Sequence, residues 1–264
     1  MSPLTHDARS ESVALVTGAS RGIGRAVARR LAEDFSAVVA VARSAGDLEE
    51  IAAAIEAAGA RAFPLALDLR QREAPGQVVA RTLEKFGRID ALVNVAGAVP
   101  QKDLFVLTDE EWEDGLALKF HGARRLTLCA WDALKAAKGA VVLTSGASAL
   151  APKASLAAVA TINAAISALA KAFSERGIEE GVQVNSLLPG PVMTDRRRSM
   201  LALYGAAHGL SLEAASQRFI DEARVSRYGA PEEIAELVAF LVSPAARWMT
   251  GVAVRMDGGE AKAV

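Results

Sequence analysis

The chain has 264 residues, a length that suits one α/β domain of ordinary size. Its 30 lysines and arginines nearly balance 31 aspartates and glutamates, so no basic excess points to nucleic acid or to an anionic membrane surface. The single cysteine, Cys129, excludes an internal disulfide framework, and no Cys/His cluster predicts a metal site. Because Cys129 lies in a stretch rich in alanine and leucine, we expect it to be a small buried residue.

The first twelve residues, MSPLTHDARSES, lack the apolar centre of a signal peptide. No apolar run approaches the ~18 residues that would suggest a membrane span. We therefore expect a cytoplasmic protein with neither a membrane nor a nucleic acid as its partner.

Short apolar runs alternate with helical segments over the first two thirds of the chain. The runs are 13–17, 37–42, 62–67, 91–95, 140–144 and 182–187, and the helical segments are 22–34, 47–59, 72–87, 109–137 and 152–177. The runs lack polar alternation, so we expect strands covered on both faces. This order predicts an α/β fold with a doubly wound, Rossmann-like parallel sheet.

Local signals set the expected helix ends. Thr108 and Glu111 fit a capping box that opens the fourth helix. Pro152 would open the fifth helix, and Gly59, Gly87 and Gly177 would mark the ends of helices.

The pattern changes after Pro189. Residues 190–228 contain TDRRRS and irregular helical pieces, and this length is typical of a lid over a substrate. A helix at 231–242 and a strand at 252–256 follow, which brings the sheet to about seven strands. With no repeat or linker in view, we predict a single domain spanning 1–264.

A glycine-rich loop follows the first predicted strand. In TGASRGIG, Gly18, Gly22 and Gly24 would let the backbone turn tightly and approach a pyrophosphate at a helix N-terminus. A glycine string alone can be a mere turn, but its place between a strand and a helix favours a dinucleotide.

Several motifs in this order resemble the short-chain dehydrogenase/reductase family. The loop has the family's TGxxxGxG spacing, LDL at 67–69 resembles its adenine-contacting segment, NVAG at 94–97 resembles its NNAG element, and VNSLLPGPVMT at 184–194 resembles its nicotinamide-lining segment. The resemblance covers nearly the whole chain. It implies a cofactor held by Gly18, Ser20, Arg21, Gly22, Ile23, Gly24, Arg43, Asp68, Leu69, Asn94, Ala96, Gly97, Pro189, Gly190, Val192 and Thr194.

The cofactor preference follows from charge. An acidic residue after the second strand would bind the ribose hydroxyl of NAD, but this chain has Ala42 and Arg43 there and Arg21 in the loop. Two guanidinium groups suit a phosphate, which favours NADP over NAD. The alternative is that both arginines are solvated surface residues.

The family's catalytic residues do not match this chain. The family has a tyrosine and a lysine four residues apart on the fifth helix, a serine after the fifth strand and an asparagine on the fourth helix. The register gives Val159, Asn163, Gly146 and Lys119 at these positions. Val159 and Gly146 have no side chain that exchanges a proton, and loss of a proton donor would cost ~10²–10⁴ in rate.

Lysine and asparagine appear exchanged between two neighbouring helices. Lys119 can supply a positive charge or a proton near the nicotinamide, with Asn163 beside it. Alternatively, Lys119 extends to solvent. Ser145 and Ser148 flank the vacant serine position, and His121 is expected to face away from Lys119.

The predicted lid carries further candidates. Tyr204 and His208 could reach a substrate. Arg196, Arg197 and Arg198 could attract an anionic substrate such as a carboxylate or an acyl-carrier thioester, although a solvated charge cluster is the simpler interpretation.

Three functions fit these observations. The first is an NADP-dependent oxidoreductase for a small carbonyl or alcohol with a non-standard proton donor. The second is a catalytically degenerate NADP-binding subunit or regulatory protein, and the third is a non-redox lyase or isomerase. The resemblance also implies a homodimer or homotetramer built through the fourth and fifth helices.

Overall fold

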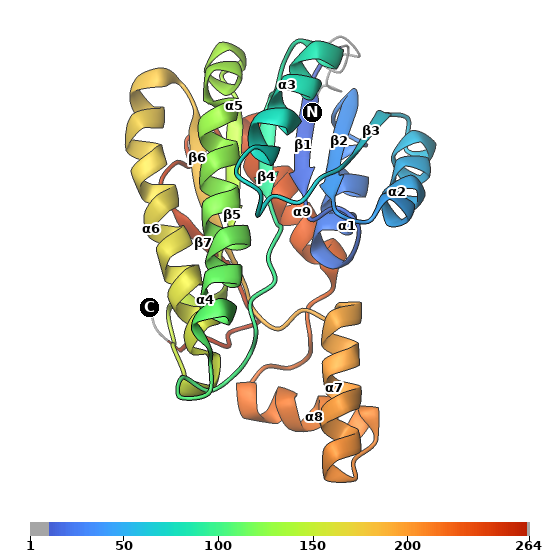
Figure 1. Ribbon diagram of the computed structural model, residues 1–264, viewed down its shortest axis with the longest axis vertical. Helices are drawn as coiled ribbons and strands as arrows, with labels where there is room; N and C mark the ends of the chain where they lie inside the picture. Colours follow the sequence, from blue (N-terminus) through green and yellow to red (C-terminus); the bar gives the residue numbers. More distant parts are fainter. Residues whose placement is uncertain (1–10, 263–264) are drawn as a thin grey trace.

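The computed structural model describes residues 11–262, which form one seven-stranded parallel sheet with helices on both faces (Figure 1). The strand order β3-β2-β1-β4-β5-β6-β7 confirms the doubly wound, Rossmann-like prediction. The signal-peptide prediction concerned residues 1–12, of which 1–10 lie outside the described residues. The strands are β1 (Val13–Thr17), β2 (Ala37–Ala42), β3 (Arg61–Ala66), β4 (Ala91–Asn94), β5 (Ala140–Thr144), β6 (Gln183–Pro189) and β7 (Ala253–Met256).

The inner strands are apolar because helices cover both of their faces. Every residue of β1, β4 and β5 is buried. The edge strand β3 departs from the prediction, since only Leu65 is buried in it. In β7, the other edge strand, exposed residues alternate with half-buried ones. An edge strand pairs with another strand on one side only, so its side chains can be exposed. The absence of polar alternation in its sequence therefore did not show that helices cover both of its faces.

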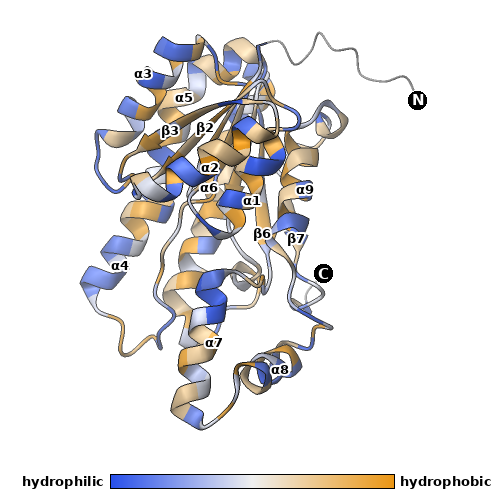
Figure 2. Cartoon of the chain, turned by 90° about the vertical axis from the view of Figure 1, so that its right-hand side faces the viewer, coloured by the Kyte–Doolittle hydropathy of each residue, from blue (hydrophilic) through white to orange (hydrophobic). Residues whose placement is uncertain are grey.

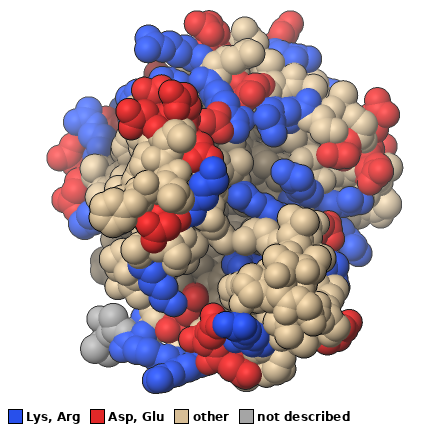
Figure 3. Space-filling view, turned by 60° about the horizontal axis from the view of Figure 1, so that its bottom comes forward, with Lys and Arg blue, Asp and Glu red and all other residues tan. Residues whose placement is uncertain are grey.

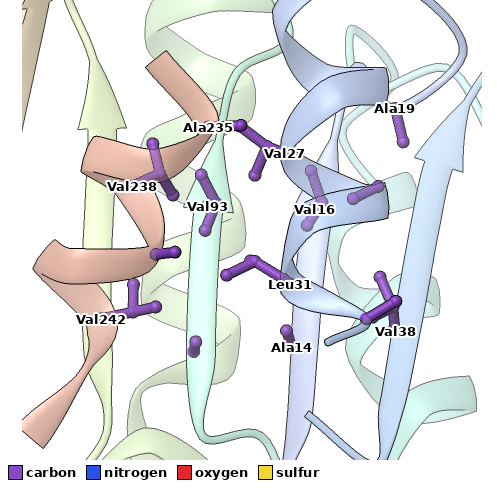
Figure 4. Packing of buried hydrophobic residues seen from close by; sticks show 14 of the residues in the cluster. Ala14, Val16, Ala19, Val27, Leu31, Val38, Val93, Ala235, Val238 and Val242 are labelled. Atoms are coloured by element: carbon purple, nitrogen blue, oxygen red, sulfur yellow. The ribbon is translucent and has the colours of Figure 1, made fainter. Parts of the chain in front are cut away.

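Two helical layers enclose the sheet. In one layer, Val27 and Leu31 of α1 and Val238 of α9 pack around Val16 and Val93 of the sheet (Figure 4). Leu126 and Leu134 contribute to the core on the opposite face. The first layer contains α1 (Gly22–Leu31), α2 (Ala45–Ala57) and α9 (Pro231–Val242), and the second contains α3 (Ala74–Phe86), α5 (Ala123–Ala137) and α6 (Ala157–Glu180).

The segment 109–137 is interrupted where one helix was predicted. It consists of α4 (Asp109–Gly115), a π segment (Leu116–Gly122) and α5. The capping box is confirmed, because the Thr108 side chain accepts from the Glu111 backbone and the Glu111 side chain accepts from the Thr108 backbone. A π segment widens the helix and often marks a functional site. This one contains Lys119.

The bounds predicted for α6 are wrong at both ends. A 3₁₀ turn (Ala154–Leu156) separates Pro152 from the helix, which continues to Glu180 and ends at Gly181 with φ +77°. Gly177 lies inside the helix, where an added Cβ would meet the carbonyl oxygen of Val182 at 2.1 Å. Gly177 is therefore needed for the close approach of the chain to α6.

The stretch Ala154–Glu180 is long and apolar enough to cross a membrane by length and composition, contrary to our expectation that no segment approaches this. Its buried residues include Ile162, Ile166 and Ala170. Of these, Ile166 and Ala170 belong to the core between the sheet and the layer of α3, α5 and α6. One face of the helix therefore packs into the core of the domain.

The segment 190–228 forms two regular helices, α7 (Asp195–His208) and α8 (Leu212–Ala223), rather than irregular pieces. The side chains of Thr194 and Ser211 cap their N-termini. Both helices project beyond the carboxyl ends of the strands and stand apart from the sheet (Figures 1 and 2). Their role as a lid stays a prediction.

Cys129 is exposed, so the prediction of a buried cysteine was wrong. The buried face of α5 follows helical spacing and is made by Ala123, Leu126, Thr127, Ala130 and Leu134. Cys129 falls outside this stripe.

Candidate functional site

The glycine loop joins the end of β1 to the start of α1. Gly18 has φ +67°, and a Cβ on Gly24 would lie 2.1 Å from the carbonyl oxygen of Gly18. Helix α1 has no side-chain cap and no acidic residue in its first turn. Its first N–H groups are therefore not used by a cap, and a phosphate is the kind of partner that a helix N-terminus favours.

Most of the predicted cofactor residues gather around one hollow at this end of the sheet, here called the loop hollow. Lys and Arg side chains border the hollowed face (Figure 3). The predicted residues that line the loop hollow are Gly18, Ser20, Arg21, Gly22, Ile23, Gly24, Arg43, Asp68, Leu69, Ala96, Gly97 and Thr194.

The charges of the loop hollow suit an anionic ligand. Arg21 and Arg43 are exposed, and neither forms a salt bridge with any carboxylate in 11–262. Asp68 accepts from the backbone N–H of Arg70 at 3.0 Å, and its carboxylate also lies 3.4 Å from that guanidinium. The residues present therefore fit a dinucleotide with an additional phosphate.

Asn94 is not among the residues that line the loop hollow. Its side chain is 5% exposed, and its Nδ2 donates to Thr127 Oγ1 at 3.3 Å. The backbone beyond it is fixed by Thr17, whose Oγ1 accepts from the N–H groups of Val95 and Ala96 at 3.0 and 3.1 Å. The buried Asn94 thus lies behind the wall of the hollow and joins β4 to α5 through Thr127.

A second hollow, here called the lysine hollow, adjoins the first. The two share Ile23, Val95, Gly97, Thr194 and Arg196. The other residues of the lysine hollow include the remaining predicted cofactor residues and the catalytic candidate, and they are Val99, Gln101, Lys119, Thr144, Ser145, Val159, Pro189, Gly190, Val192, Arg197 and Met200.

Lys119 enters the lysine hollow from the π segment. Its Nζ donates to the carbonyl oxygen of Ser145 at 3.0 Å and to Oδ1 of Asn163. Burial, with a smaller effect of the positive charge of Arg196, lowers the pKa of Lys119 to about 8. The structure therefore brings together Lys119 and Asn163, as the apparent exchange of residues predicted.

The side chain of Asn163 packs directly against the backbone of Gly146. A Cβ on Gly146 would lie 2.5 Å from Nδ2 of Asn163, so the amide occupies the space that a side chain at 146 would need. The same Nδ2 donates to Ser148 Oγ at 2.9 Å, and Ser145 Oγ donates to the Asn163 carbonyl oxygen at 2.7 Å. Sequence reasoning considered both serines but missed this anchoring role, since only the fold brings 145–148 against α6.

The remaining candidates fall outside both hollows. His121 packs edge-on against Phe120, and its pKa is lowered by burial and by nearby arginines. Tyr204 and His208 stack on each other in α7 at 4.1 Å between ring centroids, and Tyr204 also meets Phe219 of α8. These aromatic contacts hold the two helices together. Within 11–262, no group of three or more metal-ligating side chains is present.

We predict that Gly146→Ser destabilises the protein by ~1–3 kcal/mol, because the new side chain displaces the Asn163 amide. Asn163→Ala should relieve much of this cost, which gives a favourable interaction free energy in a double-mutant cycle of urea unfolding. Strictly additive effects would show that the two positions are independent. Gly76→Ala, where an added Cβ meets nothing within 4 Å, is the matched glycine control.

Comparison with known proteins agrees with this geometry. The family model for short chain dehydrogenase matches residues 12–205. The chain is 34% identical over 249 residues to the short-chain reductase protein NovJ of Streptomyces niveus, covering 94% of each. It is 31% identical to the 2,3-dihydro-2,3-dihydroxybenzoate dehydrogenase of Bacillus subtilis, covering 94% of this chain and 95% of that one.

Solved structures extend the likeness to the whole fold. L-sorbose reductase from Gluconobacter frateurii, complexed with NADPH and L-sorbose, superposes with a TM-score of 0.92 at 29% identity, covering 97% of this chain and 98% of the other. A variant actinorhodin polyketide ketoreductase with NADPH gives 0.90 at 29%, covering 97% and 99%. On the family match, the sequence relatives and the shared fold, the chain belongs to the short-chain dehydrogenase family of oxidoreductases.

Proposed function

We propose that this protein is an NADP(H)-dependent oxidoreductase that acts on a small carbonyl or alcohol substrate, with Lys119 as its proton donor and acceptor. The observation that carries the proposal is the position of the Lys119 amine. It lines the lysine hollow, is held by two oxygens and has a pKa of about 8.

The cofactor would lie across the two hollows. The glycine loop and the start of α1 would hold its pyrophosphate, Arg21 and Arg43 its additional phosphate, and Pro189, Gly190, Val192 and Thr194 its nicotinamide end. When bound, NADPH supplies a hydride to the substrate carbonyl carbon. The NADPH-bound relatives support a preference for NADP over NAD. Arg21 and Arg43 would give this preference its physical reason, because they can bind the additional phosphate.

The positions that the family uses for proton transfer cannot perform it here. In this register Gly146 and Val159 replace the serine and tyrosine, and Asn163 replaces the lysine. Val159 instead packs against the small apolar cluster that contains Val99 and Ile162. Apart from two arginines, Lys119 is the one titratable side chain that lines the lysine hollow in 11–262. We infer that the chain is an atypical member in which Lys119 has taken over proton transfer.

The hydrogen bonds of Lys119 give this transfer a direction. An ammonium group has three N–H donors, and two of them point to Ser145 O and Asn163 Oδ1. The third N–H is left for the oxygen of the substrate. After it gives up that proton, the neutral amine keeps its two donors in place and directs its lone pair toward the same oxygen. Asn163 acts as a positioning residue in this scheme.

Three further expectations remain part of this proposal. Helices α7 and α8 would cover the bound substrate as a lid. Association into a homodimer or homotetramer would use α5 and α6, on which Leu128 and Ile178 are 52% and 62% exposed. The protein would act in the cytoplasm.

We predict that Lys119→Met lowers kcat/KM for carbonyl reduction by ~10²–10⁴, because no other group in the hollow donates a proton near neutral pH. Affinity for NADPH, measured by fluorescence titration, should change little. Lys119→Arg should not restore activity, since a guanidinium does not release its proton. The control is Lys102→Met, which removes a lysine that pairs with Glu111 outside both hollows.

Activity that survives in Lys119→Met would remove this residue from the mechanism. Tight NADPH binding without turnover of any carbonyl or alcohol would favour the degenerate subunit. Turnover of a substrate with no change in cofactor absorbance would favour a lyase or isomerase.

We also predict that Arg43→Leu weakens NADPH binding by roughly tenfold or more and leaves NADH binding nearly unchanged, because a charge-assisted hydrogen bond contributes about 1.5–3 kcal/mol. Arg25→Leu is the control, since Arg25 pairs with Glu50 at 3.3 Å and does not line the hollow. Equal losses for both cofactors would contradict the assignment of Arg43 to the additional phosphate.

A further inference from the structure

Three consecutive arginines at the start of α7 have different surroundings. Arg196 lines both hollows, and its guanidinium donates to the carbonyl oxygen of Val99 at 3.0 Å. Arg197 lines the lysine hollow alone, whereas Arg198 is exposed and lines neither. The side chains of successive residues in a helix point about 100° apart. The three arginine side chains therefore face different surroundings. The interpretation as a solvated cluster does not fit Arg197, which is half-buried, whereas Arg196 and Arg198 are exposed.

The lysine hollow has positive charge that no acidic residue in its lining balances. Its charged lining residues are Lys119, Arg196 and Arg197. Burial and the charges of Arg21 and Arg197 lower the pKa of Arg196, and Arg196 in turn contributes to the lowered pKa of Lys119. A bound cofactor would place its phosphates in the loop hollow, near Arg21 and Arg196. Arg197 is the arginine left without an assigned partner.

Arg197 is half-buried, and its guanidinium forms neither a salt bridge nor a hydrogen bond with the described residues. Burying a guanidinium without a partner is costly, so such a group points to a missing anion. Glu260 is an acidic group on which the charge of Arg197 acts, and it lines another cavity together with Glu222, Lys153, Arg224 and Lys262. Burial raises the pKa of Glu260, as does Asp257, whereas Lys153, Arg197 and Lys262 lower it, and no salt bridge joins Glu260 to Arg197 among the described residues.

Tyr228 supplies a second, independent sign of a missing ligand. Its hydroxyl is buried and has no hydrogen-bond partner among residues 11–262. Arg197 and Glu260 are the charged groups that shift its pKa, the first downward and the second upward, while burial raises it. A buried hydroxyl without a partner is uncommon in folded proteins. Tyr228 is close enough to Arg197 to sense its charge, and the next residue, Gly229, forms a backbone bridge with Val192 of the hollow lining.

We propose that the substrate carries a carboxylate in addition to its reactive carbonyl, and that Arg197 binds this carboxylate with the hydroxyl of Tyr228 beside it. The substrate class is thus an oxo acid or the matching hydroxy acid. A guanidinium presents two parallel N–H donors to a carboxylate, and the tyrosine hydroxyl adds one. The anchored acid would turn its carbonyl toward Lys119. This assignment rests on the proposed function, which supplies the reaction.

The first experiment measures binding without turnover. Benzoate and pentanoate, and their neutral primary amides, are titrated calorimetrically into the protein saturated with NADP⁺. The carboxylates should bind about tenfold or more tightly than the amides, which is the effect of one charge-assisted contact. Arg197→Met should abolish this difference and Tyr228→Phe should reduce it, while NADP⁺ affinity and circular dichroism stay unchanged. Arg198→Met is the matched control and should bind as the wild type does.

Equal affinity for acid and amide would overturn the proposal, as would no binding of either or an equal loss in Arg198→Met. Because no reaction is needed, this result stands even if Lys119 proves not to be catalytic. The second experiment compares oxo acids with their methyl esters as substrates for NADPH oxidation. The acids should have the higher kcat/KM, and Arg197→Met should raise KM for the acids and leave that for the esters unchanged.

Discussion

The amine of Lys119 is held between the carbonyl oxygen of Ser145 and the amide oxygen of Asn163, and the rest of the cleft is arranged around that pairing. The two oxygens fix the direction of the amine, and burial favours its neutral form enough to bring its pKa to about 8. A lysine on the surface would stay protonated at any physiological pH. In the proposed mechanism, the partial burial of Lys119 is what would let the same side chain give and take a proton near neutral pH.

Several neighbouring residues make sense only together with this pairing. Gly97 leaves room for the aliphatic stem of Lys119, whose Cδ would lie 3.1 Å from a Cβ at 97. Gly146 leaves room for the Asn163 amide, and Ser148 holds the other end of that amide. A substitution at any one of these positions disturbs the amine through contacts, not through long-range charge. Gly97, Gly146, Ser148, Lys119 and Asn163 therefore form one coupled arrangement.

The sequence predicted the fold well because apolar runs and helical segments alternate regularly, and β1, β2, β5 and α9 have the predicted bounds. The glycine loop was predictable because turn geometry and phosphate binding both require its spacing. The side chains were harder. The exchange of residues predicted that Lys119 and Asn163 lie close together, but nothing in the sequence shows the π segment that carries Lys119. Nor does the sequence show that Asn94 bonds Thr127 behind the hollow, or that Arg197 and Arg198 differ in their surroundings. Such contacts join residues tens of positions apart.

The most direct test of Lys119 as the proton donor is the pH dependence of kcat/KM for carbonyl reduction at saturating NADPH. Reduction requires the protonated amine, so the rate should be level at lower pH and fall as the pH rises through the pKa of Lys119, about 8. The reverse oxidation requires the neutral amine and should rise through the same range. Both bends should vanish in the residual activity of Lys119→Met. A flat profile to about pH 9.5, or a bend that Lys119→Met retains, would contradict the account.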